Sequence, residues 1–117
     1  MFTAERALLI TRNPLDTMVS LFNLIATASH DLSVLDSDFE LFKQNWQERV
    51  KLEIPIWNKF YEYWLNKKDI PVHVVRYEDI KEDPYRYMKG VLEFVLEVDD
   101  ISGTKVHRYL QMVVASK

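Results

Sequence analysis

Short apolar runs alternate along the chain with longer segments whose apolar residues recur every three or four positions. The uncharged run Ala7–Thr11 and the β-branched run Val72–Arg76 are typical of buried strands. Apolar residues at helical spacing predict five helices, which cover about residues 14–28, 37–50, 55–66, 84–96 and 105–114. The predicted order is therefore strand, three helices, strand and two helices.

Prolines and capping residues mark where these elements begin and end. Asn13 is a good N-cap and Pro14 is favoured in the first turn of the helix that follows. Pro55 is interpreted as the first residue of a separate helix, and Glu78–Asp83 as a polar turn. Asp99, Asp100 and Ser102 are expected to cap the last helix.

Two buried strands separated by helices favour a parallel α/β arrangement with a right-handed crossover. Parallel sheets normally contain more than two strands and are covered by helices on both faces. We therefore expect a helix-rich, three-layer α/β fold of which this chain holds only part. A length of 117 residues fits one domain, so the prediction is a single, incomplete domain over residues 1–117.

Composition excludes several classes of function. Apolar residues make up 48% of the chain, which rules out intrinsic disorder. Lys and Arg number 15 against 18 Asp and Glu, and a net charge of −3 gives no broad basic surface for nucleic acid or an anionic membrane. The absence of Cys excludes thiol catalysis, disulfides and cysteine zinc sites, and two Gly exclude a glycine-rich phosphate loop within the chain.

Neither a targeting segment nor a membrane helix is predicted. The start of the chain is too charged for a signal peptide, and no apolar stretch approaches the roughly 20 residues that a membrane helix needs. We therefore expect a soluble, cytoplasmic protein. His30, His73 and His107 lack metal-ligand spacing, so each is interpreted as a structural or surface residue and no metal is predicted.

A candidate phosphate site follows the first predicted strand. Arg12 comes directly after that strand, and Ser20 lies two turns into the next helix. Ligands of open α/β sheets bind beyond the carboxyl ends of the strands, where a helix N-terminus and an Arg side chain both favour phosphate. An alternative stays open, in which Arg12 pairs with Asp16 or Glu78 and the Ser20 hydroxyl bonds to its own helix.

A second polar cluster, Arg76–Asp79, follows the second predicted strand. If the two strands are parallel, it faces the same crevice as Arg12. Tyr77 can stack on a base or form a hydrogen bond with it. Glu78 and Asp79 are interpreted as capping or ion-pairing residues rather than catalytic ones.

These two clusters resemble motifs of one family. The stretch Arg12–Ser20 reads Arg-Asn-Pro-x-Asp-x-x-x-Ser and resembles the 3′-phosphate-binding motif of the PAPS-dependent sulfotransferases. The stretch Arg76–Pro84 resembles that family's Tyr-Glu-Asp-Leu-Lys-x-x-Pro-like segment. The two motifs occur in the family's order, with Tyr77 65 residues after Arg12. The resemblance covers about residues 5–97.

The resemblance implies a fold and a set of ligand-binding residues. The fold is expected to be part of a P-loop-type sulfotransferase domain. Arg12 and Ser20 are expected to bind the 3′-phosphate of 3′-phosphoadenosine 5′-phosphosulfate (PAPS) or its product PAP, and Tyr77 to lie near the adenine. The reaction implied is transfer of a sulfuryl group from PAPS to a hydroxyl or amine acceptor, without a metal.

Other parts of the family's pattern have no counterpart in the sequence. The Lys-Ser-Gly-Thr-like loop for the 5′-phosphosulfate lies upstream of the Arg motif, and only eleven residues precede Arg12 here. The upstream base, usually a histidine, has no match, nor has the late Arg-Lys-Gly clamp after Lys105. We therefore assign no catalytic residue and expect a carboxyl-side portion of the domain.

Three hypotheses about function follow. The first is a sulfotransferase-family enzyme represented by its nucleotide-binding part, with a nucleotide co-substrate and an unidentified small-molecule or protein acceptor. The second is a non-catalytic nucleotide-binding or protein-interaction module that kept the fold. The third is an α/β domain without a small-molecule site. The first hypothesis needs residues from a longer chain, a second copy or a partner that supplies the missing half.

Overall fold

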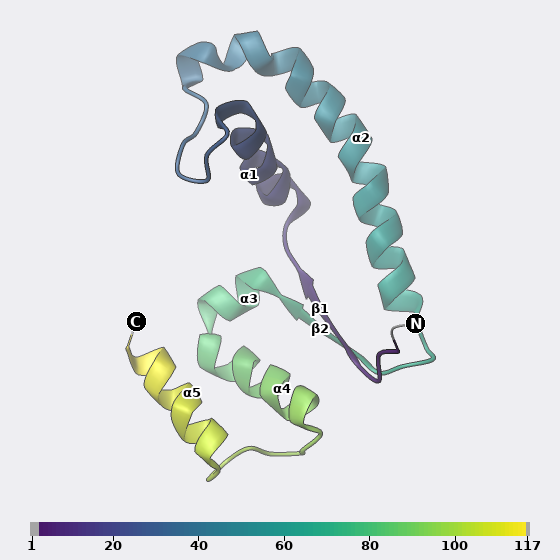
Figure 1. Ribbon diagram of the computed structural model, residues 1–117, viewed down its shortest axis with the longest axis vertical. Helices are drawn as coiled ribbons and strands as arrows, with labels where there is room; N and C mark the ends of the chain where they lie inside the picture. Colours follow the sequence, from purple (N-terminus) through teal and green to yellow (C-terminus); the bar gives the residue numbers. More distant parts are fainter. Residues whose placement is uncertain (1–2, 117) are drawn as a thin grey trace. The chain divides into compact units, whose positions relative to one another are not determined.

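A computed structural model of the chain describes residues 3–116. The elements follow in the order β1 (Ala7–Thr11), α1 (Pro14–Thr27), the short 3-10 helix η1 (Asp36–Asp38), α2 (Phe39–Asn66), β2 (Val72–Arg76), α3 (Tyr77–Glu82), α4 (Pro84–Leu96) and α5 (Lys105–Ala115) (Figure 1). They form two compact units. The first contains the described residues up to Arg12 and from Asn66 onward, and the second is Asn13–Leu65. The single domain over residues 1–117 stays a prediction.

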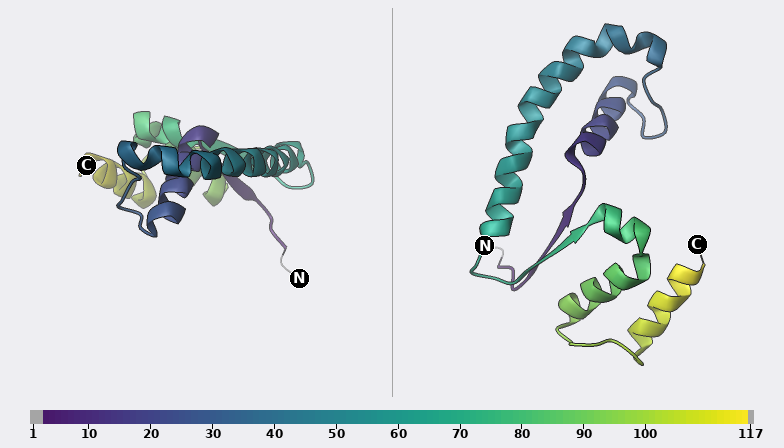
Figure 2. Two further views of the ribbon diagram at one scale, coloured as in Figure 1. Left: turned by 90° about the horizontal axis from the view of Figure 1, so that it is seen from above. Right: turned by 180° about the vertical axis from the view of Figure 1, so that it is seen from behind.

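The first unit is built on a two-stranded parallel sheet, as the sequence predicts. β1 and β2 lie side by side in Figure 1 and in the right-hand view of Figure 2, in a register that pairs Ala7 with Val72 and Thr11 with Arg76. Helix α4 packs against β2, where the His73 ring stacks on Phe94 with the ring centroids 5.1 Å apart. A helix-rich α/β arrangement with parallel strands is therefore confirmed.

The loop between α4 and α5 contains the most buried side chain of the first unit. Ile101 is only 1% exposed. Helix α5 is capped by Thr104, whose hydroxyl accepts a hydrogen bond from the His107 amide at 3.2 Å. The prediction that Asp99–Ser102 caps this helix is wrong, because a cap must immediately precede the helix and Gly103, in the left-handed region at φ 79°, lies between.

Asp100 instead holds the α4–α5 loop together. Its carboxylate accepts hydrogen bonds from the Ser102 amide at 2.9 Å and the Ser102 hydroxyl at 2.7 Å. The Lys89 ammonium donates to it at 3.0 Å. These bonds, those from Ser102 first, hold the pKa of Asp100 well below its usual range. Glu93 and then Asp100 raise the pKa of Lys89 in turn.

We expect the Asp100→Asn substitution to reduce the acid sensitivity of the fold. A carboxyl whose pKa is lower in the folded chain stabilises it above the unfolded pKa of about 3.9, and this stabilisation is lost as the pH falls toward the folded pKa. Because Asp100 is exposed, the effect is small. Thermal melts between pH 7 and pH 2.5 should show a slightly lower Tm for the variant at pH 7. Its Tm should then fall less than that of the unchanged chain as the pH is lowered to 2.5.

The neighbouring carboxylate provides the matched control for this experiment. Asp99 is also exposed, and it makes no ion pair in the part of the chain that the structure describes. Asp99→Asn should leave the pH dependence of the Tm nearly unchanged. An equal response of the two variants would mean that the bonds of Asp100 add nothing to stability.

The second unit is a helical hairpin. Helix α1 runs beside the first part of α2 in Figure 1 and in the right-hand view of Figure 2. The Phe22 ring meets Phe42 and Trp46 edge to face, with centroids 6.2 and 5.3 Å away. Ala28 ends α1 in the left-handed conformation with φ 54°. Aromatic contacts of Phe22 thus join the two helices.

The structure corrects the prediction of two helices over residues 37–66. Helix α2 is continuous and contains Pro55 in its interior. A proline inside a helix removes one amide from the hydrogen-bond ladder, and its ring crowds the carbonyl four residues earlier. Trp46, Val50, Trp57 and Trp64 keep one helical phase across the proline, so a single helix keeps these apolar side chains on one face.

The predicted polar turn at Glu78–Asp83 is also wrong, because residues 77–82 form the short helix α3. The Asp83 amide bonds to the Asp79 carbonyl at 2.9 Å, which completes the last turn of α3. The Asp83 side chain then accepts from the Arg86 amide at 3.1 Å and caps α4. The polar residues there stop one helix and start the next.

Candidate nucleotide-phosphate site

Two of the three predicted site residues meet at the carboxyl edge of the sheet. Arg12 directly follows β1, and Tyr77 directly follows β2. The strands are parallel and Thr11 pairs with Arg76, so both residues leave the sheet at the same end. The guanidinium carbon of Arg12 lies over the Tyr77 ring, 4.7 Å from its centroid. This is a cation–π contact, which holds an Arg side chain by electrostatic attraction to the ring.

A third side chain, which the sequence does not single out, joins this pair. The Lys81 ammonium lies 5.8 Å from the centroid of the Tyr77 ring. Lys81 is four residues after Tyr77 in α3, a spacing that puts both on one face of a helix. That spacing would have revealed the contact if residues 77–82 had been predicted as helix rather than turn.

The ion pairs among the described residues of the first unit include neither Arg12 nor Lys81. Within that unit the ion pairs join Arg6 to Glu97, Lys67 to Asp69, Arg76 to Asp79, and Lys89 to Glu93 and Asp100. Neither Arg12 nor Lys81 makes an ion pair with any described carboxylate of its unit. The alternative in which Arg12 pairs with Glu78 is therefore not supported. Asp16 belongs to the second unit, and its pairing with Arg12 stays a hypothesis.

Ser20 lies in the second unit, on a helix whose start agrees with the prediction. The Asn13 side chain caps α1 by accepting from the Leu15 amide at 2.9 Å, and Pro14 occupies the first turn. Ser20 is exposed, and its hydroxyl makes no hydrogen bond to its own helix in the described part of the chain. Its role in phosphate binding stays a prediction.

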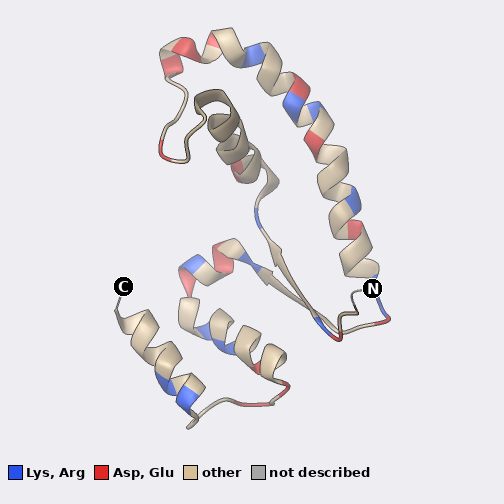
Figure 3. Ribbon diagram, in the orientation of Figure 1, with Lys and Arg blue, Asp and Glu red and all other residues tan. Residues whose placement is uncertain are grey.

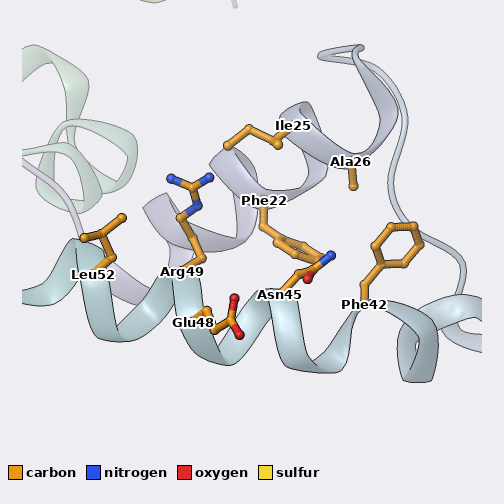
Figure 4. Close-up of a pocket in the computed structure, with 8 residues that line it drawn as sticks. All are labelled: Phe22, Ile25, Ala26, Phe42, Asn45, Glu48, Arg49 and Leu52. Carbon is orange, nitrogen blue, oxygen red and sulfur yellow. The ribbon is translucent and has the colours of Figure 1, made fainter.

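Two pockets lie between the helices of the second unit. The larger, of about 470 Å³, has Phe22 and Ile25 on α1 and Asn45, Glu48 and Arg49 on α2 among its lining residues (Figure 4). The smaller, of about 310 Å³, is lined by residues that include the aromatic side chains of α2, which are Trp57, Phe60 and Tyr61. Both volumes are in the range of small-molecule sites. Aromatic side chains of α2 therefore line part of the smaller pocket, and no side chain of α2 is fully buried.

The charged side chains show no field of one sign. Lys and Arg alternate with Asp and Glu along α2, and both signs also occur on α3 and α4 (Figure 3). The positive charge of Arg12 and Lys81 beside the Tyr77 ring is therefore a local feature. Among residues 3–116, no helix is long and apolar enough to cross a membrane.

The histidines have packing contacts rather than a shared site. His107 lies 2.5 Å from the Tyr85 hydroxyl and accepts from the Gly103 amide at 3.3 Å, which links α4 to the start of α5. His73 stacks on Phe94, and His30 is exposed beyond α1. Within the described residues, no group of three or more His, Cys, Asp or Glu side chains is placed to hold a metal ion.

Known proteins similar to this chain share one family. The family model of the sulfotransferase domain matches residues 2–112. Sulfotransferase 1A1 of Rattus norvegicus is 33% identical over 77% of this chain and 30% of its own length. Cytosolic sulfotransferase 3 of Arabidopsis thaliana is 31% identical over 74% of this chain and 28% of its own length. The chain thus spans less than a third of these relatives. No solved structure matches it.

Proposed function

Because this chain belongs to the sulfotransferase domain family, we propose that it forms the 3′-phosphate-binding part of a PAPS-dependent sulfotransferase with a P-loop-type fold. The observation that carries the proposal is the Arg12–Tyr77 contact at the carboxyl edge of two parallel strands. That edge is where open α/β sheets bind ligands. The cation there has no carboxylate partner in its own unit, which favours an anionic ligand.

Each proposed site residue has a physical role in binding the nucleotide. The Arg12 guanidinium supplies a planar, permanently charged fork for two phosphate oxygens. The Ser20 hydroxyl donates a further hydrogen bond to the same phosphate. Tyr77 lies on the adenine side. Together they hold PAPS so that its sulfuryl group has a fixed direction, which is the positioning that group transfer requires.

In the proposed reaction an oxygen or nitrogen of the acceptor attacks the sulfur of PAPS. The bond from sulfur to the bridging oxygen of the 5′-phosphosulfate breaks, and PAP leaves with that electron pair. The proton of the acceptor passes to a base. We assign neither this base nor the 5′-phosphosulfate loop to a residue of this chain, and the proposal gives these residues binding and orientation only.

A second candidate function is a non-catalytic module that binds the nucleotide or a partner protein. One observation favours it: Arg12, Ser20 and Tyr77 are all proposed to bind the nucleotide, and no residue of the chain is assigned to catalysis. For the enzyme, and for a module that binds the nucleotide, the ligand we propose is PAPS or PAP. The similarity to relatives whose names include the word cytosolic also leads us to propose a cytosolic location.

The binding proposal predicts that PAP stabilises the chain. A ligand that binds only the folded state raises its stability by about 2.7 kcal/mol at a concentration 100 times its Kd. Saturating PAP should therefore raise the Tm clearly, and adenosine 5′-phosphate, which lacks the 3′-phosphate, should raise it less. A Tm that does not respond to PAP would reject the nucleotide site. Sulfuryl transfer to a panel of phenols and amines then separates the enzyme from the non-catalytic module.

A further inference from the structure

We propose that the Tyr77 ring positions the Arg12 side chain to bind the 3′-phosphate, and that Lys81 is a second cation of the same anion site. The inference rests on the proposed function, because it takes the 3′-phosphate of PAP as the anion. It assigns Lys81 a role in binding and gives Tyr77 a role beyond contact with the adenine.

The Tyr77 ring is the common neighbour of both cations. The guanidinium carbon of Arg12 is 4.7 Å and the ammonium of Lys81 is 5.8 Å from its centroid. Both distances lie within the 6 Å over which a ring face attracts a cation. The ring therefore restricts a long side chain from the end of β1 and another from α3, which would otherwise sample many rotamers.

This arrangement places two positive charges beside one ring, and neither makes an ion pair with a described carboxylate of its own unit. Asp79, on the same helix as Lys81, is paired with Arg76 at 3.6 Å. Asp83 is engaged in capping α4. Like charges near one ring repel each other, and a dianionic phosphate removes that repulsion while it forms charge-assisted hydrogen bonds with both. The site is thus arranged for an anion.

The same geometry limits what Tyr77 can do for the base. The Arg12 guanidinium lies over the ring, so it occupies a face on which an adenine would otherwise stack. Lys81 is exposed, so its ammonium can reach a ligand in solvent. Removal of the ring should therefore weaken recognition of the 3′-phosphate more than recognition of the adenosine portion.

The test compares two ligands, PAP and adenosine 5′-phosphate, by titration calorimetry on the 117-residue chain. Tyr77→Leu removes the ring and Tyr77→Phe keeps it, while Lys81→Gln removes the charge and Lys81→Arg keeps it. We expect Tyr77→Leu and Lys81→Gln to weaken PAP by about 3- to 10-fold and adenosine 5′-phosphate by less than twofold. Tyr77→Phe and Lys81→Arg should bind PAP nearly as well as the unchanged chain.

Matched controls separate a local effect from a loss of structure. Lys105 is an exposed cation of the same unit at the start of α5, and Lys105→Gln should not alter PAP affinity. Circular dichroism checks that each variant is folded. If Tyr77→Leu does not fold, Tyr77→Phe and Lys81→Gln still test the inference, through the ratio of the affinity for PAP to the affinity for adenosine 5′-phosphate.

Three outcomes would overturn the inference, and they are distinguishable. Equal weakening of both nucleotides by Tyr77→Phe would show that the hydroxyl acts on the base. A Lys81→Gln variant that behaves like Lys105→Gln would remove Lys81 from the site. An unchanged chain that binds PAP no better than adenosine 5′-phosphate would reject the proposed 3′-phosphate site itself.

Discussion

Replacing Arg12 with alanine is expected to weaken PAP binding by about 10- to 100-fold, which is the value of one or two charge-assisted hydrogen bonds. The guanidinium lies over Tyr77 at the carboxyl edge of the sheet and has no carboxylate partner in its unit. Its loss removes the fork for the phosphate without breaking an ion pair within its own unit. Titration calorimetry with PAP measures the loss, and the Tm without ligand should change little.

Two further variants define what Arg12 contributes. Arg12→Lys keeps the charge but loses the planar fork, so its PAP affinity should lie between those of the unchanged chain and Arg12→Ala. Arg108 is an exposed arginine on α5 of the same unit, and Arg108→Ala should leave the affinity unchanged. If Arg12→Ala and Arg108→Ala bind PAP equally well, Arg12 does not contact the phosphate.

The largest expected effect on stability belongs to Ile101. This side chain is 1% exposed in the loop between α4 and α5, where its removal leaves a cavity. Ile101→Ala should lower the free energy of unfolding by about 2–5 kcal/mol, and Ile101→Val by about 0.5–1.5 kcal/mol. Urea titrations followed by far-ultraviolet circular dichroism measure both.

An exposed apolar residue of the same unit provides the control for Ile101→Ala. Val113 is exposed on α5 of the same unit, and Val113→Ala should cost no more than about 0.5 kcal/mol. An Ile101→Ala variant as stable as Val113→Ala would show that this loop does not contribute to the core.

The sequence predicts well those elements whose signals are local. The strands Ala7–Thr11 and Val72–Arg76 have the predicted bounds, and α1 starts at the predicted cap, Asn13. Each is determined by neighbouring residues: an apolar run, or an N-cap followed by proline. The parallel pairing of the strands also follows, because a long helical connection separates them.

The errors arise where two local signals compete. Pro55 suggests a helix start, yet the apolar side chains on either side keep one helical phase, and this longer-range pattern prevails. The carboxylates of Glu78–Asp83 suggest a turn, yet they form α3 and cap α4. The missed contact of Lys81 follows directly from the missed helix.

The candidate site also divides into features that local sequence patterns predict and features that they do not. The spacing of Arg12 and Tyr77 after two strands predicts that they share one edge of a sheet, and the structure places them in contact. The position of Ser20 depends on how the second unit meets the first, which no local pattern in the sequence encodes. Asp79, by contrast, is interpreted from the sequence as a capping or ion-pairing residue, and the structure pairs it with Arg76 at the end of β2.

The register of the sheet also has a consequence for the order of folding. β1 can pair with β2 only after residues 13–71 have been synthesised, because Ala7 pairs with Val72. Closing so long a loop is slow compared with forming the α1–α2 or α4–α5 hairpin, whose contacts are local. At ~5–20 residues per second on a ribosome, β1 waits several seconds for β2 after its own residues have been made. In that interval its apolar run Leu8–Ile10 can associate with other chains.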